Sequence, residues 1–167
     1  MANTFVLIAS VTVGSGGAAN IDFTSIPSTY TDLLLFASTR PDGTDTWTNI
    51  SFNGSTSNFS SIRITGDGSS ASSASAATNF ANILNGRSSY TANTFSNGSL
   101  YIPNYAGSNN KSFSTDSVNE NNATEAVTAL IAGLRSNTAA INQITLTPNS
   151  GSFIQYSTAY LYGISNS

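Results

Sequence analysis

The feature that most constrains this chain is a succession of short β-type segments separated by turns that contain glycine or asparagine. In one of them, Ile144 and Leu146 alternate with Thr145 and Thr147, which is the two-residue period of a strand with one buried face. About ten such segments follow one another at roughly regular spacing. The pattern predicts an all-β fold, an antiparallel jelly-roll-like β-sandwich.

Several segments carry more specific expectations. Asn53-Gly54 is the strongest hairpin signal, and Asp67-Gly68 closes the strand that follows it. The apolar run at residues 33–36 predicts a strand buried on both faces. Residues 141–148 and 153–164, joined by a short turn, predict a pair of strands that closes the sheet.

One segment departs from the β pattern. Ala77, Phe80, Ala81 and Leu84 recur at helical spacing, so one short helix is expected near residues 77–85. A Ser/Ala tract of low complexity precedes it. Because the chain contains no internal repeat and no linker, we expect residues 1–167 to form a single β-sandwich domain.

Composition excludes several classes of function. The chain has no cysteine and no histidine, which excludes disulfides, thiolate or imidazole metal sites and histidine-based catalytic triads. Its net charge of −3 and five scattered basic residues argue against nucleic-acid binding. The apolar run at residues 5–9 is better explained as a first strand than as a signal peptide, and no run is long enough to span a membrane.

The surface is expected to be polar but weakly charged. Only 8% of the residues are charged, against about 25% in a typical protein, while Ser, Thr and Asn fill 70 of the 167 positions. Such a surface repels identical neighbours only weakly. The composition therefore favours a subunit of a large assembly, or an extracellular surface, over a cytosolic enzyme.

The positions of the acidic residues are typical of turns and solvated edges more than of a catalytic or metal site. Asp42 and Asp45 form an oxygen-rich loop, but turn hydrogen bonding explains them better than a bound cation. Asp116, Glu120 and Glu125 are expected to mark a solvated edge. We therefore predict no catalytic residues, no metal ligands and no cofactor, in a protein that is not an enzyme.

Aromatic residues are the remaining candidates for a functional surface. Trp47, Tyr101 and Tyr105 are predicted to lie at an interface between subunits, because aromatic side chains contribute large contact areas. The alternative is that they stack on sugar rings, with Trp47 beside the Asp42–Asp45 turn.

Several segments resemble a group of small virion proteins of tailed phages. The likeness covers most of the chain and is carried by residues 8–17, 21–27, 30–35, 52–55, 92–95, 102–105, 144–148 and 161–164. These are strand-and-turn motifs and include no catalytic residues. The resemblance implies a structural β-sandwich subunit, expected to be a homotrimer, displayed on the virion.

The resemblance leaves two positions on the particle open. A decoration or cement protein would bind the major capsid protein on the outer capsid surface and stabilise the head. A tail-fibre or appendage tip would bind a host surface glycan. Decoration is the expectation, since the chain starts with a strand almost at once and has no coiled-coil or collagen-like shaft. A lectin-like module is a third possibility, and an enzyme a distant fourth.

Overall fold

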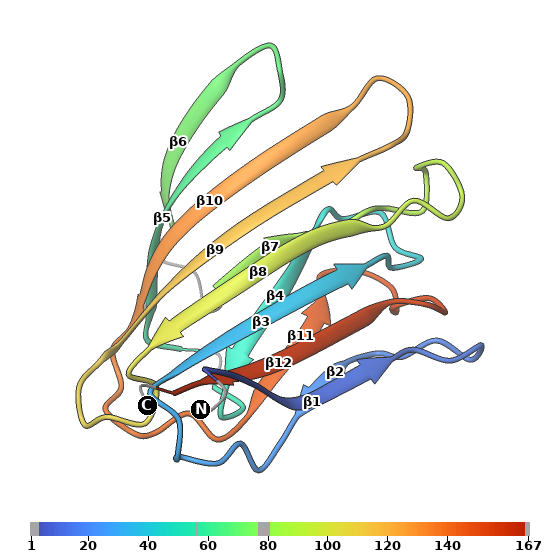
Figure 1. Cartoon of the computed structure of the whole chain (residues 1–167). Coiled ribbons are helices and arrows are strands. Elements are labelled where there is room, and N and C mark those ends of the chain that lie inside the picture. Colours follow the sequence, from blue (N-terminus) through green and yellow to red (C-terminus); the bar gives the residue numbers. More distant parts are fainter. Residues whose placement is uncertain (1–3, 56, 77–80, 166–167) are drawn as a thin grey trace.

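The computed structural model describes residues 4–55, 57–76 and 81–165, which form twelve β-strands and no helix (Figure 1). The strands are β1 (Phe5–Thr12), β2 (Ile21–Phe23), β3 (Asp32–Thr39), β4 (Trp47–Phe52), β5 (Phe59–Gly66), β6 (Ala71–Ala76), β7 (Ala81–Leu84), β8 (Ser96–Pro103), β9 (Lys111–Glu120), β10 (Ala126–Arg135), β11 (Ile144–Pro148) and β12 (Thr158–Ile164). The expected all-β class is confirmed, with two strands more than the ten or so predicted.

The strands form two sheets that pack face to face. The larger sheet has the order β1-β12-β3-β8-β9-β10-β5-β6, and the smaller has the order β2-β11-β4-β7. Every paired strand is antiparallel to its neighbour. The predicted antiparallel β-sandwich is therefore confirmed, as an unequal pair of sheets (Figure 1).

Two expected hairpins are instead crossings between the sheets. The last two strands do not pair, since β11 lies between β2 and β4 in the smaller sheet and β12 lies between β1 and β3 in the larger. Asn53 and Gly54 do form a tight turn with positive φ angles of 53° and 66°, but β4 and β5 on its two sides belong to different sheets. These pairings were predicted wrongly because turn chemistry fixes the local bend and not the partner of each strand.

The predicted helix is also wrong where the structure describes that region. Ala81–Leu84 form β7, which pairs with β4, while residues 77–80 lie outside the described part. A short apolar run is compatible with the period of a helix and with that of a strand, and tertiary pairing decides between the two. Most of the preceding Ser/Ala tract forms β6, a strand that was not predicted, and the Asp67-Gly68 turn joins it to β5 in a hairpin.

The core lies between the sheets and centres on aromatic side chains. Phe52, Phe59 and Phe113 contact one another with ring centroids 5.5–6.1 Å apart. Gly133 makes room for this cluster, because a Cβ atom at that position would lie 2.0 Å from Cζ of Phe113. The cluster joins the larger sheet to β4 of the smaller one.

The larger sheet is covered on one side only. In β3, Leu33 and Leu35 are buried, but Phe36 is 47% exposed. The prediction that residues 33–36 are buried on both faces is therefore wrong, because no second layer lies over this side of the sheet.

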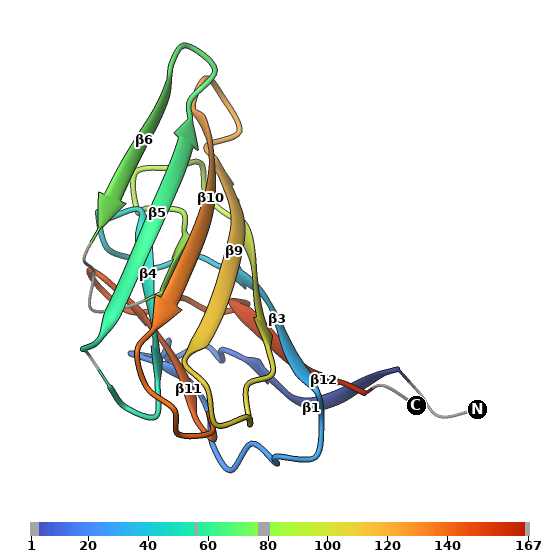
Figure 2. The same ribbon diagram turned by 90° about the vertical axis from the view of Figure 1, so that its left-hand side faces the viewer.

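One end of the larger sheet extends past the smaller one. In Figure 2 the far ends of β5, β6, β9 and β10 rise above the four-stranded sheet and leave their inner side uncovered. Within the described ranges, no helix suited to crossing a membrane is found.

Candidate functional site

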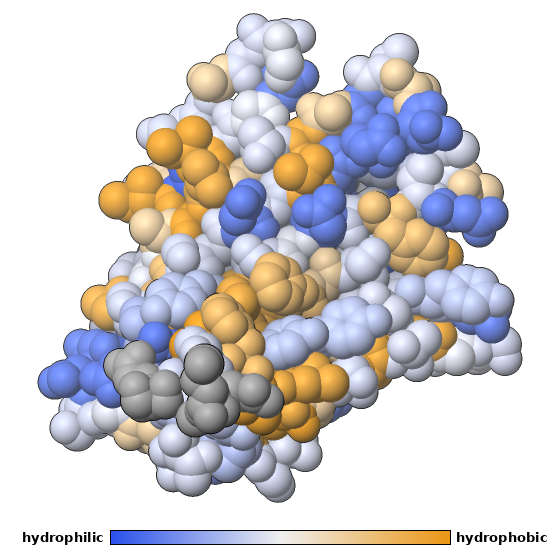
Figure 3. All heavy atoms as spheres, in the orientation of Figure 1, coloured by the Kyte–Doolittle hydropathy of each residue, from blue (hydrophilic) through white to orange (hydrophobic). Residues whose placement is uncertain are grey.

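The side of the larger sheet that points away from the smaller sheet, here called the outer face, carries apolar and aromatic side chains in register. One row across the strands runs through Ile64, Leu130, Asp116, Ser99, Phe36 and Tyr160, and the next runs through Ile62, Ala132, Ser114, Tyr101, Leu34 and Tyr162. Ile62 is 62% exposed, among the most exposed large apolar side chains of the described residues. Figure 3 looks onto this face and shows apolar patches separated by polar groups.

Three shallow hollows indent the outer face. The largest, of about 580 Å³, lies around Ile62 between β5, β6 and β10. A second, of about 410 Å³, lies between Phe36 and Tyr160 and reaches Asp116. The third, of about 280 Å³, lies between them beside Leu130. Indentations flanked by apolar side chains are surfaces into which another protein can fit.

Charge is distributed unevenly over the molecule. All five lysine and arginine residues lie in the described ranges, and none of them contributes to the rows of the outer face. Arg40, Lys111 and Arg135 are buried, with at most 6% exposure. The charged groups that the outer face offers, Asp32, Asp116 and Glu120, are all acidic.

The opposite side of the same strands forms a polar cleft of about 300 Å³ where the smaller sheet ends. The polar cleft is lined by Thr46, Trp47, Arg63, Thr65, Ser72, Leu84, Arg87, Asn119, Glu125 and Val127. Two arginines and one glutamate leave one positive charge in excess. The outer face and the polar cleft are thus two sides of one layer of strands.

The inner side of β9 builds one wall of the polar cleft and also completes β7. Among the described strands, β7 pairs only with β4, so its other edge needs partners. Three inward side chains of β9 supply them: Thr115 Oγ1 donates to Asn82 O (2.9 Å), Ser117 Oγ accepts from Leu84 N (3.0 Å) and Asn119 Nδ2 donates to Asn85 O (3.1 Å). Since a carbonyl only accepts, the Asn119 amide is fixed, and its buried Oδ1 has no partner among the described residues.

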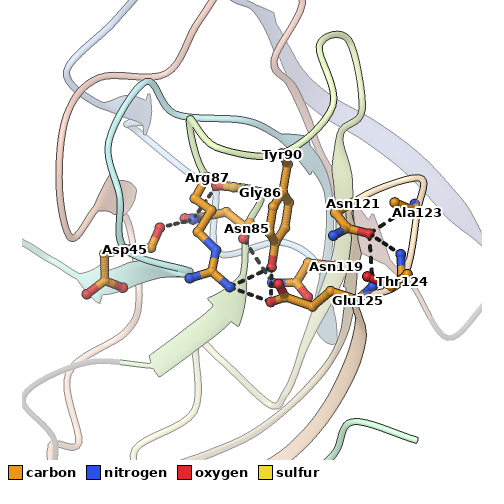
Figure 4. Close-up of polar contacts among 10 residues, drawn as sticks. All are labelled: Asp45, Asn85, Gly86, Arg87, Tyr90, Asn119, Asn121, Ala123, Thr124 and Glu125. Atoms are coloured by element: carbon orange, nitrogen blue, oxygen red, sulfur yellow. Dashed lines mark hydrogen bonds and ion pairs between the residues drawn. The ribbon is translucent and has the colours of Figure 1, made fainter.

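An ion pair between the β7–β8 loop and the β9–β10 turn closes the cleft at one end. Glu125 Oε1 accepts hydrogen bonds from Tyr90 Oη and Arg87 Nη2, both at 2.5 Å (Figure 4). The Tyr90 bond, followed by the Arg87 contacts, holds the pKa of Glu125 below its usual range. A separate hydrogen bond from Arg87 Nη2 to Tyr90 Oη (3.4 Å), followed by the contact with Glu125, raises the pKa of Arg87, so this pair stays ionised near neutral pH.

The buried Arg40 and the partly buried Asn121 position the ion pair. The Arg40 guanidinium donates to the carbonyls of Thr91 (2.6 Å), Tyr90 (2.9 Å) and Thr94 (3.0 Å), and so holds the loop that carries Tyr90. On the other side, Asn121 Oδ1 accepts three backbone N–H groups of its turn, including that of Glu125 at 2.9 Å (Figure 4).

The second arginine of the cleft is held by the single tryptophan of the chain. Arg63 points inward from β5, and its guanidinium carbon lies 4.8 Å from the centroid of the Trp47 ring. A cation over an indole face is attracted by the ring quadrupole. Trp47 therefore fixes the orientation of Arg63.

The three predicted interface residues lie in three different environments. Tyr101 is on the outer face, 37% exposed, and its hydroxyl donates to Asp32 Oδ2 at 2.7 Å. Trp47 is half-buried at the polar cleft. Tyr105 is fully buried and its hydroxyl donates to the Pro27 carbonyl, so its side chain has no surface to offer a partner in this conformation.

The polar cleft was not predicted from the sequence. Arg63, Arg87 and Asn119 were not predicted as site residues, and Glu125, expected at a solvated edge, is half-buried in an ion pair. The one available signal is that Arg63 lies between two isoleucines, which places it on the opposite side of β5 from them.

Both aspartates of the Asp42–Asp45 loop accept backbone hydrogen bonds. Asp45 Oδ1 accepts from Trp47 N at 2.8 Å, which fits the turn interpretation. Asp42 Oδ1 accepts from Ser152 N at 2.7 Å and so joins the loop to the segment between β11 and β12. In the described part of the chain, no group of three or more acidic side chains is placed to hold a metal ion.

Comparisons of the chain with protein-family models, with curated proteins and with solved structures found no match.

Proposed function

We propose that this chain is a structural subunit of a tailed-phage virion that decorates the capsid, attaching to its neighbours through the outer face. The observation that carries the proposal is the outer face itself, with its two rows of apolar and aromatic side chains and its hollows. Large apolar patches that stay open to water often mark surfaces for protein–protein contact.

The chemistry of the outer face suits close packing. Its polar positions are mostly short Ser, Thr and Asn side chains, which lose little conformational freedom when a partner covers them. Its few charges are acidic and widely spaced, so a partner would need to desolvate few ions. In the proposal, other copies of this chain and the major capsid protein cover this face, with a homotrimer as the assembled unit.

The free edge of the larger sheet offers a second route to self-association. Among the described residues, β6 pairs only with β5, and its sequence contains no charged residue or proline. Natural edge strands usually carry such residues to prevent pairing. At the opposite edge, β1 has a bulge between Leu7 and Ala9, a feature that does oppose strand addition.

The mechanism is mechanical. Each contact made by the outer face is modest, but the contacts repeat over the capsid lattice, so that their combined effect exceeds that of any single one. A clamp of this kind stabilises the head without catalytic residues.

Oligomerisation and capsid binding test the proposal. We expect wild-type protein to sediment as an oligomer and to bind capsids that lack it, and the double variant Ile62→Ser/Leu130→Ser to remain folded but lose both properties. Asp22→Asn, on the smaller sheet, is the control and should behave as wild type. A double variant that assembles and binds normally would refute the role of the outer face.

One observation favours the tail-appendage alternative. The hollow between Phe36 and Tyr160 combines aromatic rings with Asn97 and Asp116, a set of groups suited to binding a sugar. Electron cryomicroscopy of the particle separates the two functions: density over the capsid lattice supports decoration, and density at the tail supports receptor binding.

A further inference from the structure

The exposed positive charge of the lysine and arginine side chains is confined to the polar cleft. Arg63 and Arg87 are the two basic residues that are not buried, and both line the cleft. The outer face presents acidic groups. A small anion that approaches the molecule is therefore attracted to this one place.

Arg63 has a guanidinium that is oriented but not neutralised. Trp47 holds it at 4.8 Å, and no carboxylate forms an ion pair with it within the described ranges. Arg87, in contrast, is paired with Glu125 at 2.5 Å. A planar guanidinium with free donors matches the two oxygens of a carboxylate.

Hydroxyl-binding groups lie beside this cation. Both hydrogen bonds to the Glu125 carboxylate go to Oε1, so Oε2 is free of partners among the described residues. Thr65 and Ser72 add hydroxyls to the lining of the cleft. The volume of about 300 Å³ is at the lower end for small-molecule sites.

From these groups we propose that the polar cleft binds a sugar acid. The carboxylate of the ligand contacts Arg63, and a ring hydroxyl donates to Glu125 Oε2. A uronate satisfies both requirements, whereas a neutral sugar lacks the anion and acetate lacks the hydroxyls. This site is on the opposite side of the strands from the outer face and does not depend on the proposed decoration function.

The single tryptophan makes the proposal directly testable on the isolated chain. Titration with glucuronate should change Trp47 fluorescence in a saturable way, and calorimetry should give the same affinity. Arg63→Gln should weaken binding at least ~10-fold, since it removes a charge-assisted hydrogen bond. Glu125→Gln should reduce the preference for glucuronate over acetate. Asp116→Asn, on the outer side of β9, is the matched control and should bind as wild type.

Three results would overturn the proposal. Equal responses to glucuronate and acetate would show a general anion site, and equal responses to glucuronate and glucose would remove the role of Arg63. If glucuronate has no effect, and Arg63→Gln instead dissociates an oligomer, the cleft holds an acidic side chain of a second copy. Thermal unfolding of each variant establishes that it is folded, so that a lost signal reports on the site.

Discussion

The two sides of β5 reverse the usual polarity of a sandwich where this strand extends past the smaller sheet. Ile62, Ile64 and Leu130 point outward, whereas Arg63 and Thr65 point into the polar cleft. In a regular sandwich the inner side is apolar and the outer side is polar. Because the smaller sheet has only four strands, water reaches the inner side here, and the apolar side faces outward for a partner to cover.

The inner side itself changes character along the strands. At the end covered by the smaller sheet it carries Phe59, Phe113 and Ile131, which belong to the core. At the uncovered end it carries Arg63 and Thr65, which are partly exposed and line the polar cleft. Burial in a sheet therefore depends on the extent of the opposing layer as well as on the side to which a residue points.

The largest effect should come from the covered inner side. Phe113→Ala removes a ring from the core cluster and leaves a cavity, so we expect a loss of about 3–5 kcal/mol in the free energy of unfolding. Denaturation of wild type and Phe113→Ala in urea measures this loss of unfolding free energy.

The matching change on the outer face is Leu130→Ala. Since Leu130 is 53% exposed, we expect a loss of less than about 1 kcal/mol, which reflects its contact with Ile64 across the strands. Equal losses of unfolding free energy for Phe113→Ala and Leu130→Ala would show that the inner and outer sides of the larger sheet do not differ in burial.

An intermediate effect is expected where β9 completes the edge of β7. Thr115→Val and Ser117→Ala leave Asn82 O and Leu84 N buried without these partners, so each should cost about 1–3 kcal/mol of unfolding free energy. Loss of protection of the Leu84 amide in hydrogen exchange would accompany Ser117→Ala.

Ser114→Ala is the control for this pair. Ser114 lies on the same strand but is exposed on the outer face, so the change should stay within about 0.5 kcal/mol. A cost as large as that of Ser117→Ala would contradict the assignment of the two sides.

The smallest effect concerns the ion pair of the polar cleft. The pKa of Glu125 is lowered in the folded state, so its stabilising contribution is present above about pH 4.3, the value in the unfolded chain, and is lost as the pH falls through the folded pKa. Because both partners are about one-third exposed, Glu125→Gln should cost less than about 1 kcal/mol at pH 7.

Urea denaturation of wild type and of Glu125→Gln at pH 7 and pH 3 measures the contribution of the ion pair to the free energy of unfolding. The difference between wild type and Glu125→Gln should shrink at pH 3, where the carboxyl group becomes protonated in the unfolded chain. A difference that is the same at both pH values would argue against the ion pair as its source.

Some local features of the structure could be predicted from the sequence, and others could not. The alternation in β11, the strand at β12 and the turn at Asn53 were predicted, because they depend on neighbouring residues alone. Tyr101 and Tyr105 were predicted alike as interface residues, but Tyr101 is exposed on the outer face, whereas Tyr105, four residues later, is fully buried. Nothing local distinguishes them, since the difference arises from β8 ending and the chain turning inward.

The polar cleft could not be predicted either, because no local sequence feature indicates it. Its charged members Arg63, Arg87 and Glu125 come from three separate segments, and only the packing of the sheets brings them together. An arginine in a strand is expected to face solvent on the outer side of a sandwich. Arg63 also faces solvent, but on the inner side of its sheet.

The sequence by itself determined the all-β class, the positions of most strands, the absence of cysteine and histidine chemistry and the weakly charged surface. The tertiary structure decided which strands pair, which turns cross between the sheets, and which side of each strand is buried. The physical reason is that alternation divides a strand into two sides, but only the size and position of the opposing sheet decide which side loses contact with water.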